Sequence, residues 1–251
     1  MPRVLLVGLI AGCIAVDFRS ALHLLESERR EWLSGGRMAS LPLRFLAAAG
    51  LATRCASLSI WLVRRFSPAA AGSGIPQLKA VLLHLRVMGW MSLLIVEFTG
   101  GLLAIGGGLA LGREGPTVQM GGVAGKMVGR MLGMTRAERC ILIAAGGGAG
   151  LAAAFNAPPA GLVFVVEEIQ RAFTSRVFFA ALLASASADT VSRFAPGQDP
   201  VFHIEALPVP PWVCCRCFLC SAWSQACSAR SSTMPSSPVW MSSRASSRSR
   251  C

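Results

Sequence analysis

Long apolar segments recur through the first 195 residues of the chain, and they restrict its fold more than any other feature. Each is close to the length of about 20 residues that an α-helix needs to cross a bilayer. Charged residues make up only 14% of the chain, whereas soluble domains average about 25%. We therefore predict an all-α integral membrane protein that crosses a cell membrane or an inner membrane several times. The predicted spans are residues 4–25, 41–63, 87–112, 115–134, 141–166 and 177–194.

The net charge of +12 raises the possibility of a nucleic-acid partner. The basic residues are 22 arginines and two lysines, scattered between apolar runs rather than gathered in one polar segment. Tyrosine, which could stack on bases, is absent from the sequence. We therefore predict that the chain has no nucleic-acid partner and that it contacts the lipid bilayer.

Two of the apolar segments are not simple spans. Asn156-Ala157-Pro158-Pro159 interrupts the segment 141–166, and proline both removes a backbone donor and clashes with the preceding turn. Gly72-Ser73-Gly74-Ile75-Pro76 opens a short apolar segment that ends near Arg86. Broken helices at membrane depth are tolerated only where they are buried or line a cavity. We predict half-spanning helices at both places.

Small residues recur at four-residue spacing in two stripes, which would let helices approach closely in lipid. We interpret both stripes as packing surfaces. They are Gly100, Ala104, Gly108 and Gly112, and then Gly121, Gly125 and Gly129.

Three segments combine small or helix-breaking residues with a predicted helix start, at residues 72–76, 112–116 and 155–158. Proline is favoured at the first helical position, because its missing N–H would be unpaired there anyway. A helix start presents free N–H groups and a partial positive charge, which together suit an anion. We predict that these starts converge on an anion site, as in transporters. The backbone candidates are Gly74, Ile75, Arg113 and Gly115.

Two side chains belong to the same segments. The Ser73 hydroxyl could donate to the anion, or it could only cap a helix, a role that serine fills well. Glu114 is an acidic residue in a nearly uncharged region, where a carboxylate is costly. As a carboxylate it could occupy the anion site, and once protonated it could leave, so it would be both gate and proton acceptor. A structural ion pair with Arg113 is the alternative.

Glu167 and Glu168 end the apolar run that begins at Gly161. Two carboxylates at a helix end are often simply solvated, and that alternative stays open. Glu97 lies within the predicted span 87–112, where we expect a buried packing residue or a polar bridge.

Sites for other kinds of chemistry are weakly supported. Residues 148–153 resemble a dinucleotide fingerprint, with Glu168 about 20 residues later, which would suit a soluble nucleotide-binding enzyme. The prolines at 158 and 159 stop the helix that such a site requires. Cysteines between 214 and 220 have zinc-like spacing but lack a second pair of ligands. We predict no enzyme, no cofactor and no metal site.

The composition changes near Pro208. From Trp212 onward the chain holds six of its nine cysteines and many serines, without periodicity. We predict a membrane domain at residues 1–208 and an atypical tail at 209–251, which is disordered or translated out of frame.

The three motifs, Gly-Ser-Gly-Ile-Pro, Gly-Arg-Glu-Gly-Pro-Thr-Val-Gln and the run from Ala153 to Glu168, resemble the CLC family of chloride channels and proton–chloride antiporters. The resemblance covers residues 4–208 and implies the first of two inverted repeats of the CLC fold. It also implies a homodimer that carries chloride and protons, with an anion pathway in each subunit. Ser73 matches the anion-coordinating serine of the chloride-type branch, Glu114 the external gating glutamate, and Glu168 the internal proton-transfer glutamate.

The match at Glu168 favours an antiporter, with a passive voltage-gated-type chloride channel as the alternative. Some features depart from the family. Gln77 replaces a frequent glutamate, the pore tyrosine is missing, and the second repeat with its Gly-x-Phe-x-Pro loop is not found. We therefore expect the intact parent to exchange chloride for protons and the truncated chain to be inactive alone.

Overall fold

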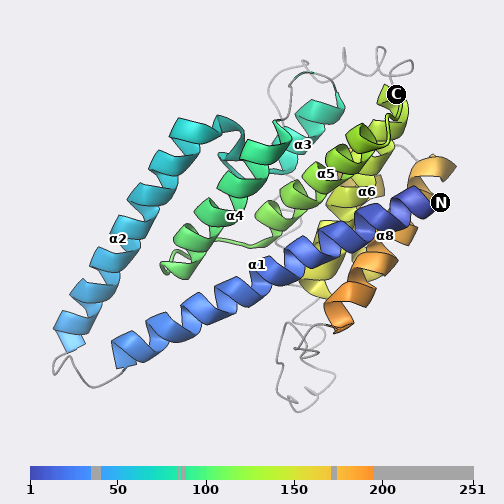
Figure 1. Ribbon diagram of the computed structural model, residues 1–251. Coiled ribbons are helices and arrows are strands. Elements are labelled where there is room, and N and C mark those ends of the chain that lie inside the picture. Colours follow the sequence, from blue (N-terminus) through green and yellow to red (C-terminus); the bar gives the residue numbers. More distant parts are fainter. Residues whose placement is uncertain (35–40, 84, 86–88, 171–173, 195–251) are drawn as a thin grey trace, which may run out of the picture. The chain divides into compact units, whose positions relative to one another are not determined.

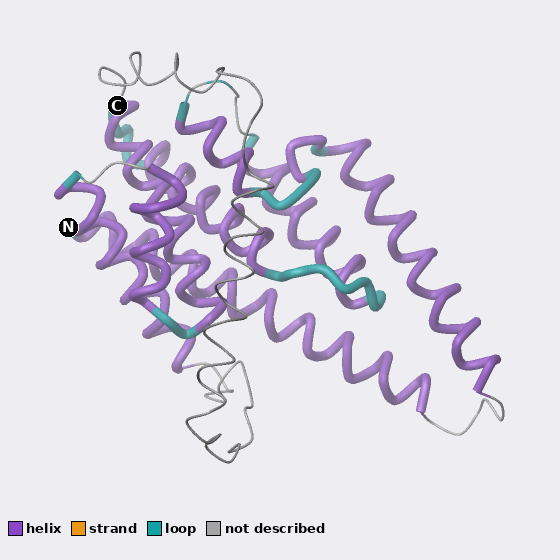
Figure 2. The backbone as a smooth tube through the Cα atoms, turned by 180° about the vertical axis from the view of Figure 1, so that it is seen from behind, coloured by secondary structure: helices purple, strands orange, loops and turns teal. Residues whose placement is uncertain are grey.

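The computed structural model describes residues 1–34, 41–83, 85, 89–170 and 174–194. Every regular element in these ranges is a helix (Figure 2). This confirms the predicted all-α class. The predicted tail 209–251, the boundary at residue 208 and the cysteine pairs between 214 and 220 lie outside the described residues.

The helices follow one another through short connections (Figure 1). The elements are α1 (Pro2–Ser34), α2 (Leu41–Phe66), the 3₁₀ turn η1 (Pro68–Ala70), α3 (Ile75–Leu82), α4 (Trp90–Gly106), α5 (Glu114–Met131), α6 (Arg136–Phe155), α7 (Pro158–Phe164), the π-helix η2 (Val165–Gln170) and α8 (Ser175–Phe194).

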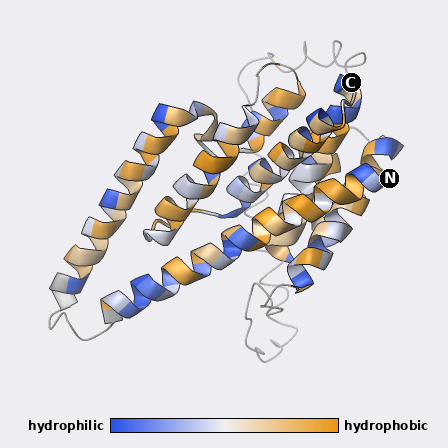
Figure 3. Cartoon of the chain, viewed as in Figure 1, coloured by the Kyte–Doolittle hydropathy of each residue, from blue (hydrophilic) through white to orange (hydrophobic). Residues whose placement is uncertain are grey.

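Four of these helices, α1, α2, α6 and α8, are long and apolar enough to cross a bilayer. α4 is apolar but shorter, and α5 is not among the candidate spans. Figure 3 shows hydrophobic residues along the middle of α1 and hydrophilic residues toward its C-terminal end. On α2, large apolar side chains such as Leu58, Ile60 and Trp61 are exposed, which suits a lipid-facing helix.

The predicted span 87–112 is wrong in extent, because α4 ends at Gly106. Gly108 then adopts a φ of 104°, a conformation that favours glycine and turns the chain away from the helix. Gly108 and Gly112 are therefore outside the helix, and the first small-residue stripe does not continue along one face. Gly100 does face another helix, α2, where a Cβ atom would lie 3.4 Å from Ser59 Oγ.

The second stripe is confirmed as a packing surface between α5 and α6. A Cβ atom added to Gly121 would overlap the carbonyl oxygen of Gly146, and one added to Gly146 would overlap that of Gly121. Gly125 lies equally close to the carbonyl of Leu142 on α6. The two backbones therefore touch without intervening side chains. α1 and α8 also pack against α6, which places the middle of α6 in the buried core.

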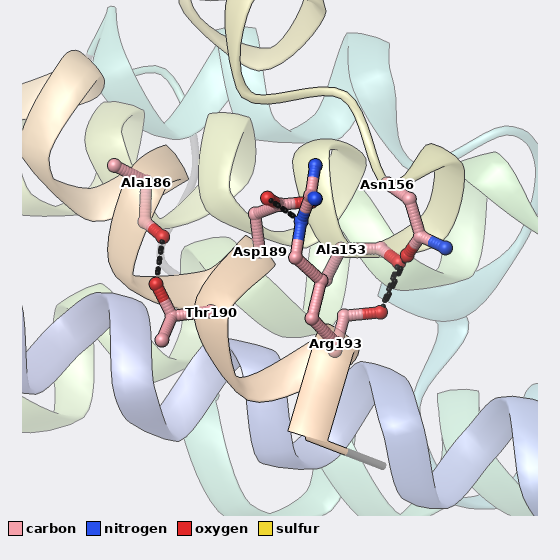
Figure 4. A network of polar contacts seen from close by, with 7 residues as sticks. Ala153, Asn156, Ala186, Asp189, Thr190 and Arg193 are labelled. Atoms are coloured by element: carbon pink, nitrogen blue, oxygen red, sulfur yellow. Dashed lines mark hydrogen bonds and ion pairs between the residues drawn. The ribbon is translucent and has the colours of Figure 1, made fainter. Parts of the chain in front are cut away.

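The predicted break in the segment 141–166 is confirmed. α6 ends at Phe155, and Asn156 takes the left-handed conformation (φ 53°, ψ 38°) before α7 begins at Pro158. The Ser192 hydroxyl of α8 donates to Asn156 Oδ1 over 2.6 Å, at the edge of a polar cluster that includes the Asp189–Arg193 ion pair (Figure 4). Asparagine both tolerates the left-handed conformation and ties the break to α8.

We expect Asn156→Ala to lower the free energy of unfolding by about 2 kcal/mol, of which about 1 is backbone strain and about 1 is the hydrogen bond. Asn156→Gly removes only the hydrogen bond and should cost about 1 kcal/mol. Denaturant titration of the purified protein in detergent measures both. Equal losses for the two variants would show that the left-handed backbone is not the cause.

Candidate functional site

The starts of α3 and α5 lie against each other. Gly74 precedes α3 with a φ of 74°, and Arg113 precedes α5. A Cβ atom on Gly115 would overlap the carbonyl oxygen of Ser73, and one on Gly74 would lie 3.0 Å from the carbonyl oxygen of Gly115. The two glycine-containing motifs therefore touch through their backbones. Proline lies within the first turn of each helix, but not at the predicted first position: Pro76 is the second residue of α3 and Pro116 the third of α5.

The structure brings two of the three predicted helix starts together. The third, at Pro158, begins α7, a helix of 7 residues that packs on α6, α8 and η2. There Gly161 lies against Gly148 of α6, and a Cβ atom on it would lie 2.7 Å from Ser185 Oγ of α8. The Asn-Ala-Pro motif thus shapes a helix break beside α8.

Ser73 is exposed and does not cap α3 through its side chain. The N-cap residue is Gly74, and no side chain caps this helix. The alternative that Ser73 only caps α3 is therefore wrong. The carbonyl of Ser73 faces Gly115, and the residue as a whole is exposed.

Two glutamines fix the turn that leads into Ser73. Gln119 of α5 is fully buried, and its Nε2 donates to the carbonyl oxygen of Ala69 over 2.9 Å. Gln77 of α3 donates through Nε2 to the carbonyl oxygen of Ala71 over 3.1 Å. An ionised carboxylate at this position could not donate, so the amide of Gln77 has a local role that a carboxylate would lack.

Gln119 was missed by the sequence reasoning. It is an uncharged polar residue inside an apolar helix, and that was the available signal. Among the described residues, its Oε1 has no hydrogen-bond partner. The same oxygen lies 2.7 Å from the position of a Cβ atom on Gly74, so Gln119 also closes the space behind the start of α3.

Glu114 is half-buried at the first residue of α5, and its side chain turns back over Gly112. No ion pair joins it to Arg113 within the part of the chain that the structure describes. Its surroundings are polar, since it lines a cavity of about 230 Å³ together with Arg19, His23 and Glu26 of α1. These α1 residues were also missed, although their spacing places them on one helical face.

Glu168 lies in η2, where the Lys79 ammonium of α3 donates to its Oε1 and forms an ion pair. Glu167, next to it, is exposed. Both line a cavity of about 540 Å³ with Ala160 and Phe164. The alternative of simple solvation therefore fits Glu167 and does not fit Glu168.

The other predicted sites have clear outcomes. Glu97 is 5% exposed in α4, in agreement with a buried residue. Residues 148–153 lie inside α6 and follow no strand, so the dinucleotide fingerprint is wrong. No cluster of three potential metal ligands occurs in the described residues.

The chain matches the profile of the voltage gated chloride channel family over residues 55–230, a range that passes the predicted boundary at residue 208. It is 41% identical over 209 residues to the H⁺/Cl⁻ exchange transporter ClcA of Vibrio cholerae. It is 44% identical over 208 residues to ClcA of Vibrio parahaemolyticus. Both alignments cover 82% of this chain and 44% of the relative, so the chain spans less than half of their length.

Two solved structures resemble the fold. A slow cyanobacterial Cl⁻/H⁺ antiporter is 34% identical with a TM-score of 0.76, over 84% of this chain and 50% of that one. A eukaryotic CLC transporter is 28% identical with a TM-score of 0.65, over 78% and 38% of the two chains. The length of the family match and the identity to the exchange transporters lead to one conclusion: the chain is an integral membrane protein of the CLC family of voltage gated chloride channels.

Proposed function

We propose that this chain forms the gate-bearing half of a membrane transporter that exchanges chloride for protons. In this proposal Glu114 is the gate, and Glu168 accepts the proton on the opposite side. Ser73 and the backbone groups of Gly74, Ile75, Arg113 and Gly115 form one side of the anion site. The contact between Ser73 and Gly115, which joins the starts of α3 and α5, is the observation that carries the proposal.

The anion site works without a full positive charge. The first N–H groups of a helix have no partner within the helix, and the helix dipole adds about half a positive charge there. Two such starts in contact attract one anion more strongly than either alone. Because this attraction is moderate, an ion can both enter and leave, which a transporter requires.

Glu114 shares the same positive field. Its carboxylate is attracted to the starts of α3 and α5 and competes there with chloride. Protonation removes its charge and therefore its attraction. In the structure the side chain points back over Gly112, toward the cavity beside α1, which gives the carboxyl group space to turn. Proton uptake and chloride entry are thus linked at one residue.

The assembly that we propose is a homodimer in a lipid bilayer, with chloride and protons as the only transported species and no covalent chemistry. We also expect the chain alone to be inactive. Ser73 is exposed in the described part of the chain, so the anion would lack donors on that side. The alignment covers 44% of the Vibrio exchange transporter, and the rest of such a protein would supply a second half.

A chimera tests the proposed function. Residues 1–208 of this chain are joined to the C-terminal half of the Vibrio cholerae exchange transporter and reconstituted in liposomes. We expect chloride uptake coupled to proton movement in the opposite direction. Chloride flux without proton movement would instead identify a passive channel. An inactive chimera, beside an active parent transporter, would contradict the proposal.

A further inference from the structure

The Lys79–Glu168 ion pair joins α3, whose start lies at the proposed anion site, to the proposed proton acceptor. Lys79 lies in the last turn of α3, the helix whose start carries Gly74. Its ammonium group donates to Glu168 Oε1, across 89 residues of sequence. Lys79 is one of two lysines in the chain, and it is the one that lies on α3.

The backbones that carry this pair are fixed by their neighbours. Leu78, adjacent to Lys79, is fully buried, and Ile169, adjacent to Glu168, is 7% exposed. Both side chains meet at Gly147 of α6, where a Cβ atom would lie 2.8 Å from Leu78 Cδ2 and 3.3 Å from Ile169 Cδ1. Lys79 and Glu168 are therefore held near each other by packing, and the ion pair is not a chance meeting of two mobile side chains.

Charged groups other than Lys79 also lie on the elements that surround η2. η2 packs against α3, α6, α7 and α8. α7 has no charged residue, and Glu167 is the only other charge on η2 itself. Three of the charged groups on the packed helices are engaged elsewhere: Glu138 in the capping box of α6, and Asp189 and Arg193 with each other. The charged groups on these helices are Lys79, Arg136, Glu138, Arg139, Arg176, Asp189 and Arg193.

We propose that Lys79 is a positioning residue that keeps Glu168 ionised and turned toward α3. A proton arriving from the aqueous side binds a carboxylate oxygen of Glu168 and displaces the ammonium group of Lys79. Each proton uptake thereby releases the end of α3, whose start contributes Gly74 to the anion site. The transport role of Glu168 in this proposal rests on the proposed function.

The expected shift in the protonation midpoint of Glu168 depends on how exposed the two side chains of the ion pair are. An opposite charge in contact lowers the midpoint of carboxyl protonation, commonly by about 1–3 pH units. The Lys79 side chain is 25% exposed and that of Glu168 45%, so water screens part of the attraction. We therefore expect the lower end of that range. Without Lys79, the carboxyl should take up its proton at about tenfold lower proton concentration.

Infrared titration of the full chain in detergent tests this proposal without any transport. Glutamate is labelled with ¹³C at the carboxyl carbon, and each spectrum is subtracted from that of the same protein with Glu168→Gln. We expect Lys79→Met to raise the midpoint of the Glu168 titration by about one pH unit. Lys79→Arg should restore the midpoint, and Lys126→Met, which removes the other lysine, should leave it unchanged.

An unchanged midpoint in Lys79→Met, or an equal shift in Lys126→Met, would overturn the proposal. Circular dichroism checks that each variant is folded, and Lys79→Gln, which keeps a donor without the charge, replaces Lys79→Met if the latter does not fold. The chimera decides the proposed function separately. A shifted midpoint in a chain whose chimera moves no chloride supports the ion pair and rejects the transport function.

Discussion

Glu114→Gln in the liposome-reconstituted chimera is expected to reduce proton movement by about 100-fold or more, while chloride movement continues. Glutamine has nearly the same shape as glutamate but cannot carry a proton across this step. It also has no negative charge to compete with chloride at the starts of α3 and α5. Parallel recordings of chloride efflux and of external pH measure the two fluxes.

The matched control for this prediction is Asp17→Asn, which also removes one acidic charge, from an exposed position on α1. It should leave both fluxes unchanged. If Glu114→Gln retained the proton flux of the unmodified chimera, Glu114 would not be the proton acceptor, and the gating role would have to be given up.

Gly121→Ala is expected to lower the free energy of unfolding of the membrane domain by about 3 kcal/mol or more. The added methyl group would overlap the carbonyl oxygen of Gly146, which belongs to the backbone of α6 and cannot rotate away. α5 and α6 would have to separate along their shared surface, and overpacking of this kind costs about 1–3 kcal/mol or more. We expect the upper end, because backbone rather than a flexible side chain must move.

Gly50→Ala is the control for Gly121→Ala. Gly50 lies in α2, and among the described residues no atom beyond the local backbone of α2 lies within 4 Å of the position of its Cβ atom. Alanine is favoured over glycine in a helix by about 1 kcal/mol, so this variant should be at least as stable as the original. Size-exclusion profiles and thermal unfolding in detergent compare the two. A monodisperse Gly121→Ala protein with unchanged unfolding temperature would contradict the tight contact.

Features set by local chemistry could be predicted from the sequence. The break at residues 156–159 was predictable because proline cannot continue a helix, and the short α3 was predictable from Gly74 and Pro76. That Gly121 lies in a helix contact followed from residue size and spacing, whereas its partner helix α6 did not. In each case the residues themselves restrict the backbone, wherever the rest of the chain lies.

Features that depend on tertiary contacts could not be predicted. The role of Gln119 depends on the turn before Ser73 lying beside α5, and the pairing of Lys79 depends on η2 lying beside α3. Neither relation has a local signature. The early end of α4 also escaped prediction, because Leu109, Ala110 and Leu111 prolong the apolar segment beyond the helix.

The π-helix η2 has a consequence for comparing this chain with its relatives. A π-turn accommodates one more residue than an α-turn, so it acts like a single insertion that shifts the helical phase of everything after it. Deleting one residue from Val165–Glu167 would let α7 continue as an α-helix and rotate the following carboxylate to a different face. Sequence identity at Glu168 therefore identifies an equivalent carboxylate, the one proposed as proton acceptor, only in relatives that keep the same phase.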